Sequence, residues 1–243
     1  MLENRESPFL SIIIPAFNEE ERIGFTLRKI IDYLELRHFQ AEIIVVDDGS
    51  SDRTAERANE ILADWPLARV ISLPKNEGKG AAVRQGVLQA SGQLILFTDA
   101  DLSTPIEELE KMLSLAAEGN QVIIGSRSLP QSEIKRRQSW LREHMGKTFN
   151  LFVRLMLIKG LKDTQCGFKL FQQEAARKIF SQLQTKGFAF DVEVLVRAQK
   201  LGYQIAQVPI VWINSPHSKV RLIKSSIRMF LDLLKIRKAI RKN

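Results

Sequence analysis

The chain has 243 residues, of which 44% are hydrophobic and 26% charged, which is typical of a globular protein with a sizeable core. Its single cysteine, Cys166, excludes an internal disulfide and indicates a reducing compartment, while no apolar stretch reaches the roughly 20 residues that a membrane-spanning helix needs. The net charge of +8 equals that of residues 219–243 alone, which hold nine Lys or Arg and one acid. This basic segment has a single aromatic residue and no nucleic-acid-binding motif, so a membrane surface is favoured over nucleic acid as its partner.

The first half of the chain predicts strands that alternate with helices. The expected strands are 9–14, 41–46, 68–73, 93–98 and 121–124, and the expected helices are 19–36, 52–63 and 79–90. This order predicts an α/β fold with a mostly parallel, doubly wound sheet. A dinucleotide fold is disfavoured because no G-x-G-x-x-G follows the first strand, and a P-loop is likewise absent.

Acidic residues follow three of these strands, at Asn18-Glu19, at Asp47-Asp48 and at Asp99-Ala100-Asp101. Ligands of such sheets bind where the strands end. Taken alone, the last pair is more simply a polar loop in which Asp101 or Ser103 caps a helix. Three acidic clusters at one edge instead favour a hard divalent cation, Mg²⁺ or Mn²⁺, because neighbouring buried carboxylates repel each other.

The second half is less regular. We expect a basic loop at 132–142, helices at 144–159, 173–182 and 190–201, an irregular segment at 163–171 and a strand at 204–212. A terminal helix, 220–240, carries an apolar stripe: Val220, Ile223, Ile227, Phe230, Leu231 and Leu234. This stripe fits either a helix at the surface of anionic lipid or a helix docked on the core.

The charge is divided between the two halves of the chain. Residues 1–130 hold 13 basic and 21 acidic side chains, and residues 131–218 hold 14 basic and 6 acidic side chains. We therefore expect a metal site in the first half to face an anion-binding, membrane-facing second half.

Several motifs resemble one family. In chain order they are Ile13–Glu20 (IIPAFNEE), Val45–Thr54 (VVDDGSSDRT), Asn76–Gly80 (NEGKG), Asp99–Leu102 (DADL), Gly125–Arg127 (GSR), Asp163–Phe171 (DTQCGFKLF) and Phe190–Glu193 (FDVE). Together they resemble the family 2 glycosyltransferases with the GT-A fold, and within them the dolichyl-phosphate β-glucosyltransferase branch. The eukaryotic members of that branch carry an N-terminal membrane anchor, which we do not expect here because Met1–Phe9 is polar.

The resemblance implies a nucleotide site and a metal site. The nucleotide site would comprise Pro15, Ala16, Phe17, Glu19, Val46, Asp48, Lys79, Asp99 and Ala100. Asp48 fits either this pocket or a cap of the following helix. Lys79 stands in a Gly-flanked turn at a helix N-terminus, where a phosphate binds readily, although a solvated surface lysine is the alternative. Asp101 would ligate the metal, Asp99 the metal or the ribose, and Ser103 stands where relatives have a third ligand.

The resemblance also implies the reaction, an inverting transfer of glucose from UDP-glucose to a polyprenyl phosphate such as dolichyl or undecaprenyl phosphate. The alternatives are mannose from GDP-mannose, or a non-catalytic nucleotide-sugar-binding module at a membrane surface. Arg127, Arg137 and Ser218 would hold the acceptor phosphate, and Asp163 would orient or deprotonate the acceptor or serve a structural role. We expect one domain over residues 1–218, with a nucleotide half (9–130) and an acceptor half (131–218), attached peripherally to the cytoplasmic face of a membrane through residues 219–243.

Overall fold

The computed structural model describes residues 7–136, 140–158, 160–214 and 222–242. Its strands are β1 (Leu10–Ala16), β2 (Ala41–Asp47), β3 (Ala68–Ser72), β4 (Leu94–Thr98), β5 (Val122–Ser126), β6 (Glu133–Arg136), β7 (Phe168–Gln172), β8 (Ile205–Pro209) and β9 (Val211–Ile213). Its helices are α1 (Glu20–Leu36), α2 (Thr54–Leu62), α3 (Lys79–Gln89), the 3₁₀ turn η1 (Ile106–Glu108), α4 (Leu109–Ala117), α5 (Trp140–Met156), α6 (Gln173–Ser181), α7 (Phe190–Lys200) and α8 (Leu222–Lys242).

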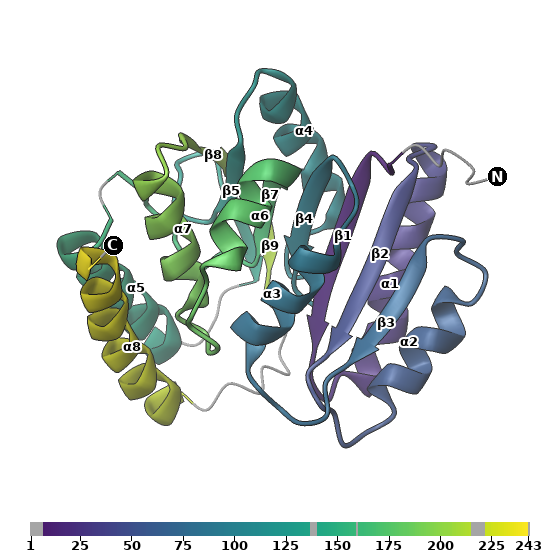
Figure 1. Ribbon diagram of the computed structural model, residues 1–243, viewed down its shortest axis with the longest axis horizontal. Coiled ribbons are helices and arrows are strands. Elements are labelled where there is room, and N and C mark those ends of the chain that lie inside the picture. Colours follow the sequence, from purple (N-terminus) through teal and green to yellow (C-terminus); the bar gives the residue numbers. More distant parts are fainter. Residues whose placement is uncertain (1–6, 137–139, 159, 215–221, 243) are drawn as a thin grey trace.

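A seven-stranded sheet forms the centre of the molecule, in the order β3-β2-β1-β4-β7-β5-β8 (Figure 1). Every neighbouring pair is parallel except the two pairs that β7 makes with β4 and β5. The predicted α/β fold with a mostly parallel sheet is therefore confirmed. The two predicted halves share this sheet, because β7, from the second half, lies between β4 and β5 of the first.

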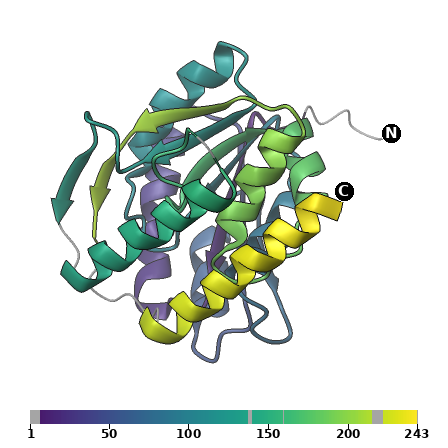
Figure 2. The same ribbon diagram turned by 90° about the vertical axis from the view of Figure 1, so that its left-hand side faces the viewer.

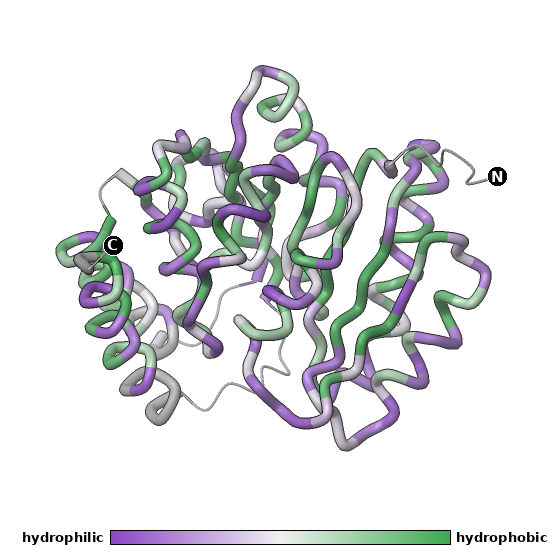
Figure 3. Tube along the Cα trace, viewed as in Figure 1, coloured by the Kyte–Doolittle hydropathy of each residue, from purple (hydrophilic) through white to green (hydrophobic). Residues whose placement is uncertain are grey.

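Helices cover both faces of the sheet and bury two apolar layers. One layer packs α1, α2 and α4 against strand residues such as Ile12, Ile14 and Val45. The other packs α3, α6 and α7 against the opposite strand residues, among them Ile13 and Phe97. β1 and β2 are buried along their whole length, as expected of parallel strands covered on both faces. Figure 3 shows this pattern as hydrophobic strands with hydrophilic loops at their ends.

The expectation that residues 163–171 are irregular is wrong at its end, because Phe168–Gln172 form β7. The strand is short, and a lysine, Lys169, interrupts its apolar run. That lysine is 1% exposed and forms a buried ion pair with Asp191 of α7. The partner lies 22 residues away in the sequence, so local pattern did not indicate that a charged residue belongs in this strand.

Two further expectations need correction. The single strand expected at 204–212 is two strands, of which β8 joins the main sheet and β9 pairs with β6 in a separate two-stranded sheet. The supposed loop at 132–142 therefore contains β6, whose residues are all exposed and lack an apolar pattern. A helix after the Asp99–Asp101 turn was considered only as an alternative and given no bounds, although the buried side chains Leu109 and Met112 of α4 show helical spacing.

The C-terminal helix α8 lies beside α5 on one side of the molecule (Figure 2). Leu233 and Ile236 are buried in the apolar layer that also contains α6 and α7. Its outward side chains Phe230, Leu231 and Leu234 are 37%, 51% and 44% exposed. The helix is thus docked on the core by one face and keeps part of the predicted stripe exposed on the other. Among the described residues, none of the helices has the length and hydropathy required to span a bilayer.

Candidate active site

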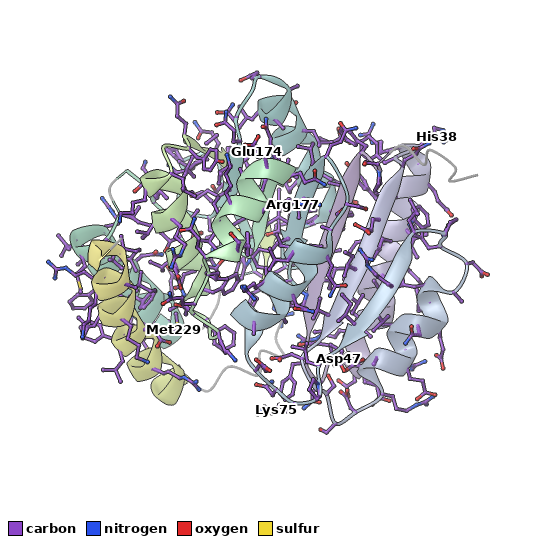
Figure 4. The ribbon with its side chains drawn as sticks, in the orientation of Figure 1. His38, Asp47, Lys75, Glu174, Arg177 and Met229 are labelled. Carbon is purple, nitrogen blue, oxygen red and sulfur yellow. The ribbon has the colours of Figure 1, made fainter. Side chains whose placement is uncertain are left out.

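The strand register brings the predicted acidic clusters to one edge of the sheet. Ala16 of β1 lies opposite Asp47 of β2, and Ile13 lies opposite Phe97 of β4. The turn that follows β4, Asp99–Asp101, is therefore level with the ends of β1 and β2. Figure 4 shows Asp47 and the loop residue Lys75 at this edge, and His38 at the opposite end of the molecule.

Two loops at this edge hold residues in the left-handed backbone region, Asn18 (φ 55°) and Leu102 (φ 46°). Asn18 tolerates this conformation, and it joins the loops after β1 and β2: its N–H donates to Ser50 Oγ at 2.8 Å and its Oδ1 accepts from the Ser51 N–H at 2.8 Å. For a leucine the conformation is uncommon. Such local strain concentrates at functional sites. Asn18 and Leu102 flank the predicted site, whereas the third residue of this kind, His38 (φ 52°), lies at the opposite end of the molecule.

Asp99 and Asp101 fit a divalent cation. Oδ1 of Asp99 is buried and makes no hydrogen bond among the described residues, although the ammonium of Lys79 lies 2.5 Å from it. Burial and the charge of Asp99 raise the pKa of Asp101, while its hydrogen bonds with Ser103 lower it. Ser103 is 8% exposed, and its backbone N–H donates to Asp101 Oδ1 at 3.0 Å. Ser103 thus supports Asp101, whereas its own ligation of the metal stays a prediction.

The protein supplies only part of a coordination shell. Within the described ranges, no three His, Cys, Asp or Glu side chains gather as a metal-binding group. Two carboxylates leave several positions of a hard cation open.

Lys79 reaches the carboxylates by its side chain, while the start of its helix is already occupied. Its Nζ lies 2.5 Å from Asp99 Oδ1, and the side chain is 22% exposed. The N–H groups of Gly80 and Ala81 donate to the carbonyl of Lys186, at 2.7 and 3.3 Å. These two amides are therefore not free to bind a phosphate, while the contact of Lys79 with a nucleotide phosphate stays a prediction. The ammonium of Lys79 remains as the cationic group.

Asp48 anchors the loop that precedes Lys79. The residue is 3% exposed, and its two carboxylate oxygens accept the N–H groups of Glu77 (2.7 Å) and Gly78 (2.9 Å). It makes no hydrogen bond to the start of the following helix, α2, where Asp52 Oδ1 instead accepts the Thr54 N–H at 3.0 Å. The alternative that we kept for Asp48 is thus wrong, and its contact with a nucleotide stays a prediction.

The other residues of the predicted nucleotide site differ in what they offer to a ligand. Those with buried side chains are Pro15, Ala16, Val46 and Ala100. The ring of Phe17 is 40% exposed at the same edge, so it is available for stacking on a base. Glu19 forms an ion pair of 2.5 Å with Arg22, which fixes the start of α1.

Arg127 and Asp163 form one unit. The carboxylate of Asp163 accepts Arg127 Nε at 2.7 Å, Nη2 at 2.9 Å and the Arg127 backbone N–H at 3.0 Å. It also accepts the N–H of Gln165 at 3.1 Å. Burial opposes ionisation of Asp163, but Arg127 and these hydrogen bonds outweigh it and lower its pKa to about 2. A carboxylate held this way orients Arg127. Of the alternatives kept for Asp163, the geometry favours the structural role over abstraction of a proton from the acceptor.

Arg127 also interacts electrostatically with Asp99, a candidate metal ligand. Its side chain is 27% exposed, and its guanidinium lies over the ring of Trp212, 5.6 Å from the centroid. The charge of Asp99 is among those that raise its pKa. An anion bound at Arg127 would therefore lie within electrostatic range of Asp99. The other two predicted acceptor residues, Arg137 and Ser218, lie outside the described residues.

Sequence reasoning missed the roles of Gly167, which positions Asp99, and of Lys169, which binds the carbonyl of the residue before Gly167. The Asp99 N–H donates to the Gly167 carbonyl at 3.2 Å, and a Cβ at Gly167 would overlap the Asp99 carboxylate. Nζ of Lys169 donates to the Cys166 carbonyl at 2.6 Å and forms the buried pair with Asp191. The charged residue inside an apolar run was the available signal, since a buried lysine requires a partner.

We expect Gly167→Ala to displace the Asp99 carboxylate and lower Mn²⁺ affinity by about tenfold, because a shift of supporting groups costs a metal site roughly 10- to 100-fold. The measurement is Mn²⁺ titration followed by electron paramagnetic resonance. Gly146→Ala in α5 is the matched control, since its added Cβ meets no atom within 4 Å. Equal Mn²⁺ affinity of the two variants would contradict this role of Gly167.

Comparison with protein families gives a match over most of the chain. The model of the family described as Glycosyl transferase family 2 matches residues 11–180. The dolichyl-phosphate β-glucosyltransferase of Dictyostelium discoideum is 38% identical, over 98% of this chain and 77% of that protein. The human dolichyl-phosphate β-glucosyltransferase is 40% identical, over 94% of this chain and 74% of that protein.

Solved structures share the fold. A crystal structure of a mycobacterial protein aligns with a TM-score of 0.72 at 23% identity, covering 95% of this chain and 75% of that one. Glucosyl-3-phosphoglycerate synthase from Mycobacterium tuberculosis, in complex with Mn²⁺, UDP and glucosyl-3-phosphoglycerate, aligns with a TM-score of 0.69 at 23% identity, covering 95% of this chain and 80% of that one. At this identity the likeness shows the fold alone.

Proposed function

Because the chain belongs to glycosyl transferase family 2, we propose that it transfers glucose from UDP-glucose to a polyprenyl phosphate such as dolichyl phosphate, with inversion at the sugar. The dolichyl-phosphate β-glucosyltransferases that resemble it over almost its whole length support the acceptor class and the sugar. A structural neighbour bound to UDP-glucose and Mn²⁺ supports UDP-glucose as donor on a shared fold.

One observation carries this proposal: two carboxylates and two cationic groups follow strands that end at the same edge of the sheet. Asp99 and Asp101 form the acidic side, with Lys79 in contact with Asp99. Arg127, fixed by Asp163, forms the second cationic group. A transfer between a nucleotide diphosphate and a phosphate brings two anions together, so it requires this mixture of charges.

Each side chain has a distinct task in the proposed reaction. Asp99 and Asp101 would hold Mg²⁺ or Mn²⁺, which neutralises charge that develops on the leaving nucleotide diphosphate. Arg127 would bind oxygens of the acceptor phosphate with the part of its guanidinium that Asp163 leaves uncovered. That phosphate is anionic already and is itself the nucleophile. A general base is therefore not required, which agrees with the low pKa of Asp163.

The test is a transfer assay with radiolabelled UDP-glucose, polyprenyl phosphate and Mg²⁺ or Mn²⁺, with the lipid product identified by mass. We expect a glucosylated lipid phosphate that requires the metal. GDP-mannose is tested in parallel, and mannosylated lipid as the main product would move the assignment to mannose. No lipid product with either donor would rule out the proposed activity and favour a non-catalytic binding module.

We also propose that the outward faces of α5 and α8 bind the cytoplasmic surface of a membrane. On α5 the exposed apolar side chains are Trp140, Leu151, Phe152 and Leu155, and on α8 they are Phe230, Leu231 and Leu234. Phe152 and Phe230 touch edge to face, 5.4 Å between centroids, so the two helices form one patch. Exposed basic side chains of α8 accompany it: Arg228, Lys235, Arg237 and Lys238. Apolar side chains beside basic ones are typical of contact with anionic lipid.

We expect Leu231→Glu/Leu234→Glu to weaken sedimentation with vesicles of anionic phospholipid by about tenfold or more, because each change removes apolar contact and adds repulsion. Truncation after residue 218 is a poorer test, since it would also uncover the core that Leu233 and Ile236 cover. Leu36→Glu is the matched control, at a leucine that is 76% exposed on α1, on the other side of the molecule (Figure 1). Unchanged sedimentation of the double variant would count against this surface.

A further inference from the structure

Lys79 occupies an unusual electrostatic position, between the candidate metal site and a buried chain of charges. Its ammonium contacts Asp99 Oδ1 at 2.5 Å and lies 5.3 Å from the ring centroid of Phe97. Lys169 lies over the same ring, at 5.6 Å, and is paired with Asp191. Asp191 and Asp101 also interact electrostatically with this lysine. The ammonium is thus ion-paired with Asp99 and lies in the field of two further carboxylates.

The same oxygen that Lys79 contacts is the one that a metal would use. Oδ1 of Asp99 is buried and makes no hydrogen bond within the described part of the chain, so the ammonium compensates its charge. A divalent cation bound between Asp99 and Asp101 would take that place. Two cations cannot share the position, because their repulsion at such separations is strong in a partly buried site.

We infer that Lys79 is the counter-ion of Asp99 in the ligand-free protein, and that a divalent cation must displace its ammonium from Asp99 in order to bind. Lys79 therefore weakens metal binding until a nucleotide diphosphate binds and forms an ion pair with the displaced ammonium. The inference rests on the proposed function, since it takes Asp99 and Asp101 as the metal ligands. The displaced ammonium keeps Asp191 as a neighbour and gains the diphosphate as a partner.

This arrangement couples the two ligands. The diphosphate draws Lys79 away from Asp99 and frees the carboxylate, and the metal in turn frees Lys79 for the diphosphate. Such coupling is reciprocal by thermodynamic necessity. It would keep the protein from holding a metal when no donor is bound.

The test is Mn²⁺ binding to the nucleotide-free protein, measured by electron paramagnetic resonance. We expect Lys79→Met to bind Mn²⁺ about tenfold more tightly than the unchanged protein, because the competing charge is gone. Lys79→Arg, which keeps the charge, should bind Mn²⁺ as weakly as the unchanged protein does. Lys186→Met is the matched control: it removes an equal charge from an exposed pair with Glu77, near the same helix start.

A second variant covers the case in which Lys79→Met fails to fold. Lys79→Gln is neutral and keeps a hydrogen-bond donor for Asp99, and it should also tighten Mn²⁺ binding. Equal or weaker Mn²⁺ binding by the folded neutral variant, with UDP still promoting Mn²⁺ binding to the unchanged protein, would overturn the counter-ion role alone. Absence of Mn²⁺ binding to every variant, with and without UDP, would overturn the metal site and the proposed function with it.

Discussion

Replacing Asp101 by alanine is expected to reduce metal-dependent glucosyl transfer by about a thousandfold, the largest effect of any single change considered. The carboxylate lies in the turn directly after β4, next to Asp99, and its pKa is raised by burial and by that neighbour. Removing it leaves one carboxylate for the cation. Product formation is measured at saturating UDP-glucose over a range of Mn²⁺ concentrations, so that lost affinity and lost turnover are separated.

The control for this loss is Asp32→Ala, which removes an exposed carboxylate from α1. We expect its activity to match that of the unchanged protein. Removal of Asp101 should leave folding intact, because it relieves repulsion between two neighbouring carboxylates. Full activity of the Asp101 variant at low Mn²⁺ would show that the cation, if needed at all, is held elsewhere.

Asp163→Asn is expected to lower the free energy of unfolding at pH 7 by about 2–3 kcal/mol, the largest effect on stability. The side chain is 2% exposed and its carboxylate makes four hydrogen bonds, three of them with Arg127. Asparagine has almost the same shape, so the loss reports the charge rather than the packing. Chemical denaturation of both proteins gives the difference.

The pH dependence of that difference is specific. The pKa of Asp163 is lowered in the folded protein, to about 2, so its ionisation stabilises the fold above the ordinary aspartate range. This contribution is complete above pH ~5 and is lost as the pH falls toward 2. The gap between the two proteins should therefore shrink over that interval. A gap that stays constant from pH 7 to pH 3 would mean that the charge of Asp163 contributes nothing.

The sequence predicted the parallel core of the fold because its signals are local. β1, β2 and β4 are apolar runs that end in polar turns, and helices of clear periodicity join them. The acidic clusters could be placed at one edge for the same reason, since the carboxyl ends of parallel strands meet there. The register of Ala16 with Asp47 is the observation that agrees with this expectation.

The features that were missed depend on partners far away in the sequence. Lys169 is compatible with β7 only because Asp191 meets it in the core. The backbone N–H groups of Gly80 and Ala81 at the start of α3 donate to the carbonyl of Lys186, more than 100 residues later. The sequence around α3 gives no sign of this partner. The orientation of Arg127 by Asp163 likewise joins residues 36 positions apart. Charge pairs between residues so far apart produce no periodic pattern in the sequence from which they could be predicted.

The antiparallel strand β7 has a consequence for how the chain is made. Because β4 lies between β1 and β7, β4 is an open sheet edge until residues 168–172 have left the ribosome. An apolar strand with unpaired backbone groups is a site for unwanted association. The backbone N–H of Asp99 likewise has no partner until Gly167 is synthesised, because the Gly167 carbonyl accepts it. The first 160 residues contain every residue of the predicted nucleotide site but not Gly167 or β7, so this part of the chain is expected to fold poorly as an isolated fragment.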